Sequence, residues 1–234
     1  MSTTAPKAID AKSSKVPHND LRREKTRERL KAGAFEAMLR MGFHETKITD
    51  ITESAGVATG TFYNHYPDKE TLVTELIKER MQADMDRVYS GPHTGDAFDD
   101  ILIPTRRFFE IIREVGPINR VFLPAIEAIP ELREAWQNLN TDLAKRIAAG
   151  AARRESGFAT TEVGRLLAAH AVQELIDAMG MKYFTWQDPA IKYLGGSPDA
   201  FAERISILCY RLLYGGDPPS EKIKFAQDLL FLPR

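Results

Sequence analysis

The chain is constrained most by one short stretch, residues 46–69, which reads TKITDITESAGVATGTFYNHYPDK. Ile48 and Ile51 give the segment before the central glycine an apolar helical face. Gly56 can adopt the positive φ that a sharp turn between two helices needs, and Val57 can fill the angle between them. The stretch therefore predicts two short helices joined by a tight turn.

The second of these helices is expected to begin at Ala58 or Thr59 and to reach about His65. Phe62 is placed to be buried against the first helix. Pro67 cannot continue the helix because its ring fixes φ and its nitrogen carries no proton. The pattern therefore predicts a compact helical pair with one buried and one outward face.

The outward face is small, polar and aromatic, and it carries almost no formal charge. Such a face suits a helix that enters the major groove of DNA and contacts base edges and phosphates. The alternative is an ordinary helical hairpin with a solvated face. The residues of this face are Thr59, Gly60, Thr61, Tyr63, Asn64 and His65.

Longer helices flank the pair. The apolar spacing predicts a first helix over residues 21–41, and Thr46 or Thr49 is expected to cap the second helix. Asp68 is expected to cap a long helix that runs to about Tyr89 and connects the turn with the rest of the chain.

At this point a resemblance becomes specific. The run AGVATGTFYNHYPDKETL resembles the DNA-binding signature of the TetR/AcrR family of bacterial transcriptional regulators, and the likeness covers about residues 22–80. A departure is Thr52, where the family usually has alanine. The resemblance implies phosphate and groove contacts by Thr61, Tyr63 and His65, base contacts by Thr59, Gly60 and Asn64, and phosphate contacts at helix N-termini by Thr46 and Lys69.

Charge supports this interpretation modestly. The whole chain of 234 residues carries a net charge of −1. Residues 1–66 hold 11 lysines and arginines against 8 acidic residues, a net +3, whereas residues 67–234 hold 21 against 25, a net −4. The positive excess therefore lies with the segment that would approach phosphates.

The chain is expected to have three parts. Residues 1–20 are poor in large apolar side chains and are predicted to form a disordered arm. Residues 21–67 form the predicted helix-turn-helix domain, and residues 68–234 form a larger helical domain for ligand binding and dimerisation. The fold class is therefore all-α, since no strand alternation of useful length occurs.

Within the larger domain, Pro104 and Pro124 are expected to kink or break helices, and Pro130 is expected to begin one. Two apolar helices, at about residues 160–185 and 198–214, are expected to pair with a second copy as a four-helix homodimer interface. The alternative is that both are simply core. A last amphipathic helix is expected at about residues 220–230.

An effector site is expected between residues 98 and 186, lined by aromatic and aliphatic groups. Its polar anchors would be Asn140 and His170, with Arg107, Arg113 and Arg120 as further candidates, and an inward arginine would favour an anionic head such as a fatty acyl group. The candidate apolar walls are Phe108, Phe109, Ile112, Phe122, Trp136, Leu139, Tyr183 and Phe184.

Other chemistry finds no support. Catalytic and metal sites and cofactors are not expected, because the histidines are scattered and no glycine-rich phosphate loop occurs. The single Cys209 fits a reducing cytoplasm, and no apolar run is long enough to predict a membrane span.

The sequence therefore predicts a cytoplasmic, homodimeric DNA-binding regulator, most simply a repressor that binds a palindromic operator in double-stranded DNA. A small, largely apolar or amphipathic effector would release it. The alternative from a different class is an all-helical small-ligand-binding protein or enzyme that does not act on DNA.

Overall fold

Helices account for all the regular secondary structure in the described part of the chain, which confirms the all-α prediction. The structure is a computed structural model, and it describes residues 18–91, 93–115, 119–154 and 161–230. Most of the predicted arm, residues 1–17, lies outside these ranges. The helices are α1 (His18–Met41), α2 (Ile48–Ala55), α3 (Thr59–Tyr63), α4 (Lys69–Val88), α5 (Asp99–Val115), α6 (Asn119–Ala128), α7 (Pro130–Ala152), α8 (Glu162–Gly180), α9 (Pro189–Gly195) and α10 (Pro198–Tyr214).

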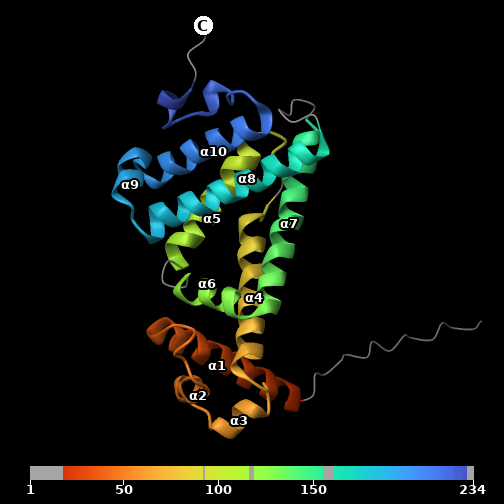
Figure 1. Ribbon diagram of the computed structural model, residues 1–234, viewed down its shortest axis with the longest axis vertical. Helices are drawn as coiled ribbons and strands as arrows, with labels where there is room; N and C mark the ends of the chain where they lie inside the picture. Colours follow the sequence, from red (N-terminus) through yellow and green to blue (C-terminus); the bar gives the residue numbers. More distant parts are fainter. Residues whose placement is uncertain (1–17, 92, 116–118, 155–160, 231–234) are drawn as a thin grey trace, which may run out of the picture.

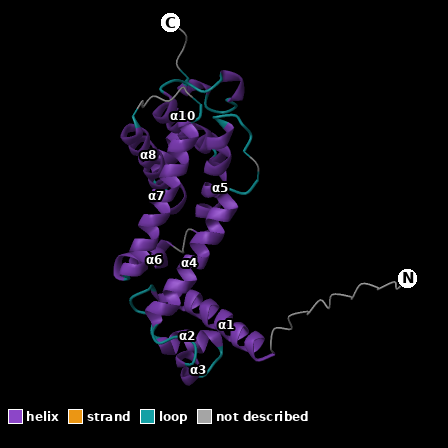
Figure 2. Ribbon diagram, turned by 90° about the vertical axis from the view of Figure 1, so that its right-hand side faces the viewer, coloured by secondary structure: helices purple, strands orange, loops and turns teal. Residues whose placement is uncertain are grey.

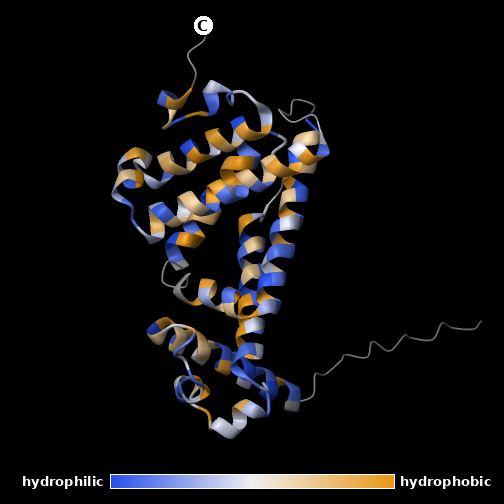
Figure 3. Ribbon diagram, in the orientation of Figure 1, coloured by the Kyte–Doolittle hydropathy of each residue, from blue (hydrophilic) through white to orange (hydrophobic). Residues whose placement is uncertain are grey.

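The first three helices gather at one end of the molecule, and α8, α9 and α10 lie at the other (Figure 1). The long helices α4 and α7 run side by side between the two ends, and both views agree on this arrangement (Figures 1 and 2). Hydrophobic residues are more frequent in α6, α8 and α10 than in α4, which is mainly hydrophilic with interspersed apolar residues (Figure 3). The early helices therefore sit on a rod that continues into the larger helical body.

Helices α1 and α2 approach each other at Gly33. A Cβ atom at this position would lie 2.7 Å from the backbone nitrogen of Ala55 and 2.7 Å from the carbonyl oxygen of Ile51. Both contacts are with backbone, which cannot move aside as a flexible side chain can. Glycine is therefore required here by the close crossing.

A first hydrophobic core joins this end to the rod. Leu30, Met38, Ile51 and Phe62 are fully buried, and they pack in one cluster with Leu72 and Ile77 of α4. Val121, Ala125 and Leu132, from α6 and α7, complete the same cluster. The core is therefore continuous across the predicted boundary at residues 67 and 68.

The prolines of α5 and α6 lie inside these helices and do not end them, so the expected breaks are wrong, while a kink at Pro104 stays a prediction. Pro104 lies inside α5 and Pro124 inside α6, whereas Pro130 begins α7 as predicted. An internal proline costs about 3 kcal/mol. Burial of apolar side chains on the same helices, such as Phe109 and Ile112, stabilises by about 1.5–3 kcal/mol each and offsets that cost.

A second hydrophobic core fills the larger body. The rings of Tyr183 and Phe201 stack with centroids 4.2 Å apart, and Phe109 stacks on Phe201 at 5.2 Å. Gly180 permits α5 to pack closely against the end of α8, because a Cβ there would lie 2.7 Å from Cδ1 of Ile112 and 2.9 Å from Cε1 of Phe109. The predicted helix over residues 160–185 ends as an α-helix at Gly180 and continues as one π-helical turn, Met181–Thr185.

The expected last helix is wrong. Residues 220–230 contain only two short 3₁₀ turns, Ser220–Lys222 and Gln227–Leu229. The carboxylate of the fully buried Glu203 accepts hydrogen bonds from the backbone nitrogens of Lys224, Phe225 and Ala226, at 3.0, 2.6 and 2.8 Å. These bonds to α10 replace the helical ladder that the amphipathic pattern suggested.

We expect Gly33→Ala to lower the free energy of unfolding by about 1–3 kcal/mol, as overpacking of a close crossing does. Gly60→Ala is the matched control, because a Cβ at Gly60 meets nothing within 4 Å. It should leave stability unchanged or raise it by up to about 1 kcal/mol through helix propensity. Urea unfolding at fixed protein concentration measures both, and equal behaviour of the two variants would contradict the crossing argument.

Candidate nucleic-acid interface and ligand cavity

The turn between α2 and α3 is stabilised by its own glycine and by an arginine on α1. Gly56 has φ of 62° in the left-handed region, as the sequence predicted. The Arg29 guanidinium on α1 donates to the carbonyl oxygens of Ala55 and Gly56, at 2.9 and 2.7 Å. Arg29 is therefore a positioning residue for this turn, and it was not singled out from the sequence.

The start of α2 differs from the expectation. The residue that caps it is Lys47, whose backbone nitrogen donates to the carboxylate of Asp50 at 2.8 Å. Thr46 is 1% exposed, and its hydroxyl donates to the carbonyl oxygen of Gly42 at 2.7 Å. Neither Thr46 nor Thr49 is the cap, because an acid three residues inside the helix binds the free backbone proton instead.

Helix α3 presents the predicted face. Phe62 is fully buried in the first core, while Thr59, Gly60 and Asn64 are exposed and Tyr63 is 58% exposed. Thr61 and His65 are half-buried beside them. The helix ends at Tyr63, two residues earlier than predicted, so Asn64 and His65 lie in the turn that follows.

His65 is neutral at neutral pH. Burial lowers the pKa of its imidazole, and the positive charges of Arg23 and Arg27 lower it further. Its Nδ1 atom is buried and has no hydrogen-bond partner among the described residues. In the absence of DNA, the surroundings of His65 therefore favour the neutral form of its ring.

Lys69 joins the start of α4 to the loop before α2. Its ammonium donates to the carbonyl oxygens of Phe43 and Thr46, each at 2.9 Å, and lies 4.6 Å from the centre of the Phe43 ring. Asp68 caps α4 as predicted, accepting from the nitrogen of Thr71 at 2.7 Å. Direct phosphate contacts by Thr46 and Lys69 stay a prediction, while these internal bonds give both residues a structural role.

A charged cluster ties α1 to α4. The carboxylate of Glu75 binds the Arg27 guanidinium, accepts from the Tyr66 hydroxyl at 3.1 Å and lies 3.6 Å from the Lys31 ammonium. Burial alone would lower the pKa of Lys31, but hydrogen bonds and charges of Glu28 and Glu79 outweigh it and raise that pKa. Lys31 therefore stays charged although it is almost fully buried.

The larger body contains a cavity of about 380 Å³ between α4, α5, α7, α8 and α10. The last turn of α4 contributes Met85 and Val88, and Tyr89 follows directly. A volume near this size lies within the range of about 300–1,000 Å³ that is usual for small-molecule sites. The far end of the rod is therefore part of the cavity wall.

The structure brings together only some of the predicted ligand residues. Phe108, Trp136, Leu139 and Asn140 line the cavity. Phe109, Ile112, Tyr183 and Phe184 instead form the aromatic core beside it, and Phe122 packs against the first core. Helical spacing marks all of these as apolar but cannot tell a cavity wall from a core.

The predicted polar anchors are mostly elsewhere. His170 is exposed on α8, and Arg107 donates to the carbonyl oxygens of Val88 and Ser90 outside the cavity. Arg113 is exposed, and the side chain of Arg120 lies outside the described residues. The polar groups that do line the cavity include Asp100, Arg154, Gln173 and Asp177, none of which the sequence singled out.

Neither a metal site nor a membrane-spanning helix is found in the described ranges. No group of three or more His, Cys, Asp or Glu residues there could hold a metal ion. No helix there is long and apolar enough to cross a membrane.

Two helices around a glycine turn, with a polar second helix presented at the tip of a rod, define a helix-turn-helix DNA-binding regulator. Residues 30–76 match the family of bacterial regulatory proteins, tetR family. An uncharacterized HTH-type transcriptional regulator, YdgC of Bacillus subtilis, is 24% identical over 203 residues, covering 83% of this chain and 95% of that relative.

Two further comparisons agree. The fatty acid metabolism regulator protein of Bacillus subtilis is 34% identical over 108 residues, which cover 46% of this chain and 55% of that relative. The structure of a regulator from Saccharomonospora viridis in complex with choline superposes with a TM-score of 0.64 at 18% identity, covering 81% of this chain and 98% of that one. The chain therefore carries the N-terminal DNA-binding segment of the tetR family at residues 30–76, and the relatives that resemble it over a longer stretch are described as transcriptional regulators.

We expect Lys69→Ala to lower the free energy of unfolding by about 1–3 kcal/mol, because two carbonyl oxygens lose a charged donor. The control is Lys78→Ala on the same helix, whose exposed pair with Glu131 contributes under about 1 kcal/mol. The salt dependence of DNA binding then shows whether Lys69 contacts a phosphate directly or only positions the loop before α2. A direct phosphate contact would reduce the slope of log affinity against log salt by about 0.9, and a purely positioning role would leave it unchanged.

Proposed function

We propose that the protein is a cytoplasmic repressor that binds a palindromic operator as a homodimer and is released by a small, largely apolar effector. The observation that carries this proposal is the arrangement of α4. Its first turn is bonded to the loop before the helix-turn-helix, and its last turn borders the cavity. One helix therefore connects the DNA-reading face with the ligand site.

The proposed DNA contacts are those of the exposed α3 face and its flanks. Thr59, Gly60 and Asn64 are proposed to read bases, whereas Thr61, Tyr63 and His65 are proposed to bind phosphates and the groove wall. Lys69 completes the set at the N-terminus of α4, whereas Thr46, which is buried and bonded to Gly42, is proposed to act only by positioning the loop before α2. Support comes from the exposure of Tyr63 and Asn64 beside the buried Phe62, which orients the face outward.

A second copy of the chain is proposed to cover α8 and α10. Val163 and Leu167 on α8 are 76% and 70% exposed, and Leu212 on α10 is 40% exposed. Exposed apolar side chains one helical turn apart are typical of a surface that a partner buries. A two-fold pair would place two α3 helices in successive major grooves, with half-site centres about 34–36 Å apart or a multiple of that.

Release is proposed to act through α4. Its 20 residues span about 30 Å at 1.5 Å per residue, from the Lys69 contacts to the cavity wall. A ligand that fits the cavity better when α4 is shifted would favour a form with the wrong half-site spacing. The proposed effector contacts are Phe108, Trp136, Leu139 and Asn140, and the choline bound to the Saccharomonospora viridis regulator supports the idea that this fold admits a small molecule.

We expect Tyr63→Ala and Asn64→Ala to affect DNA binding differently. Tyr63→Ala should weaken binding to an operator and to random duplex by the same several-fold factor, because a phosphate contact carries no sequence information. Asn64→Ala should cost about 1–3 kcal/mol on the operator alone. Titrations against a selected palindrome and a scrambled duplex measure both, and equal losses for Asn64→Ala on the two DNAs would rule out base reading.

We expect Leu167→Glu to convert the dimer to monomer, because a charge would be buried in the proposed interface. Leu123→Glu on α6, at a position that is 50% exposed, is the control and should leave the dimer intact. Sedimentation velocity at matched concentrations distinguishes the two states. A dimeric Leu167→Glu variant would place the interface elsewhere.

A further inference from the structure

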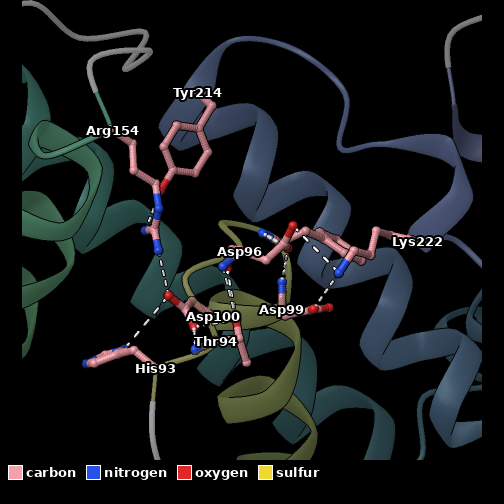
Figure 4. Close-up of polar contacts among 9 residues, drawn as sticks. His93, Thr94, Asp96, Asp99, Asp100, Arg154, Tyr214 and Lys222 are labelled. Atoms are coloured by element: carbon pink, nitrogen blue, oxygen red, sulfur yellow. Dashed lines mark hydrogen bonds and ion pairs between the residues drawn. The ribbon is translucent and has the colours of Figure 1, made fainter.

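The cavity contains one charged pair that is already satisfied. Arg154 and Asp100 form an ion pair at 2.5 Å, and the nitrogen and hydroxyl of Thr94 both donate to Asp100 at 3.0 Å (Figure 4). Burial alone would raise the pKa of Asp100, but the bonds from Thr94 and Arg154 outweigh it and lower that pKa. Arg154 therefore has its counterion within the protein and is not free to select an anionic ligand.

The other polar part of the wall lies on α8. Gln173 and Asp177 are four residues apart, so they share a helix face, and both line the cavity. Gln173 is 8% exposed, and its amide nitrogen donates to the carbonyl oxygen of Asn140 at 3.2 Å. Its Oε1 atom is buried and has no hydrogen-bond partner in the described part of the chain. A buried acceptor without a donor costs free energy that a ligand donor would recover.

Asp177 forms no ion pair with any described residue, although it borders the same cavity. Burial raises the pKa of its carboxyl to about 7, and the negative charge of Glu174 contributes to the rise. Tyr89, which is 42% exposed, lines the same cavity, and desolvation followed by the charge of Asp177 raises its pKa to about 12. A poorly solvated carboxylate of this kind is stabilised by a cation.

The other arginines near the cavity, Arg153 and Arg146, do not neutralise Asp177. Arg153 lines the cavity but is exposed to solvent, where its charge is screened. Arg146 is near enough to Tyr89 to oppose the rise in its pKa, but it is exposed and outside the cavity wall. Most of the rest of the wall is apolar, including Phe108, Trp136 and Ile176.

We propose that the effector is a cationic amphiphile, a protonated amine on an apolar body, whose ammonium group donates to the Asp177 carboxylate and to Oε1 of Gln173. This inference rests on the proposed function, because it names the class of effector for the same cavity. The sequence suggested a ligand with an anionic head, because an unpaired arginine could face the cavity. Arg154, which lines the cavity, is already paired with Asp100. The apolar body of the ligand lies against the aromatic and aliphatic wall.

Binding of three eight-carbon compounds tests the proposal: octylamine, octan-1-ol and octanoate, titrated calorimetrically into the full chain at neutral pH. They share one apolar chain and differ in the charge of the head. We expect octylamine to bind at least tenfold more tightly than octan-1-ol, and octanoate to bind most weakly. Equal affinities, a preference for octanoate, or no binding of any of the three would overturn the proposal.

Two variants locate the preference. Asp177→Asn keeps the size of the side chain and should reduce the advantage of octylamine over octan-1-ol to within twofold. Glu174→Gln removes an exposed acid one turn away on the same helix, outside the cavity wall, and should retain the tenfold advantage. If both variants lose the octylamine advantage equally, the preference comes from the overall negative charge of α8 and not from a contact with Asp177. That result would overturn the proposal. Thermal unfolding checks that each variant is folded.

DNA binding is measured separately, so the two proposals can fail independently. Octylamine binding that depends on Asp177 but does not release a palindromic duplex would overturn release by this ligand and leave the cavity chemistry standing. Failure of the unliganded protein to bind any duplex would overturn the proposed function alone.

Discussion

The carboxylate of Glu75 is the contact on which the geometry of the DNA-reading end depends. It lies on α4, yet its partners Arg27 and Lys31 belong to α1 and Tyr66 belongs to the turn after α3. Because these groups are half-buried or buried, their attraction is screened less than that of a surface pair. One acid on α4 therefore binds both α1 and the turn after α3, and so fixes the orientation of the helix-turn-helix relative to α4.

The first hydrophobic core extends this constraint beyond α4. Its members come from α1, α2 and the α3 region, and also from α6 and the start of α7. Helix α7 in turn supplies Trp136, Leu139 and Asn140 to the cavity wall. Two routes therefore connect the cavity with the reader, one along α4 and one along α7, and a movement of either rod must repack a core that contains Phe62.

Local chemistry was predictable from the sequence, whereas contacts between distant segments were not. Gly56 and Asp68 each act within three residues of their partners, and the structure has them as expected. The helices through Pro104 and Pro124 were missed because burial outweighs a local cost. The Gln173 and Asp177 wall was missed because no spacing along one helix reveals which side faces a hollow. The last helix was predicted wrongly because the backbone of that segment bonds to Glu203, which lies more than 20 residues away in the sequence.

The segment after α10 also limits which part of α10 is open to a second copy of the chain. Ile223 and Ala226 are buried in the second core, and their backbone is fastened to Glu203, so the chain covers one flank of α10 itself. Leu212 of α10 stays 40% exposed, so the proposed contact with a second copy uses the part of α10 that carries it. A pairing in which both copies use this same surface is isologous, so it closes as a two-fold dimer and does not extend into a filament.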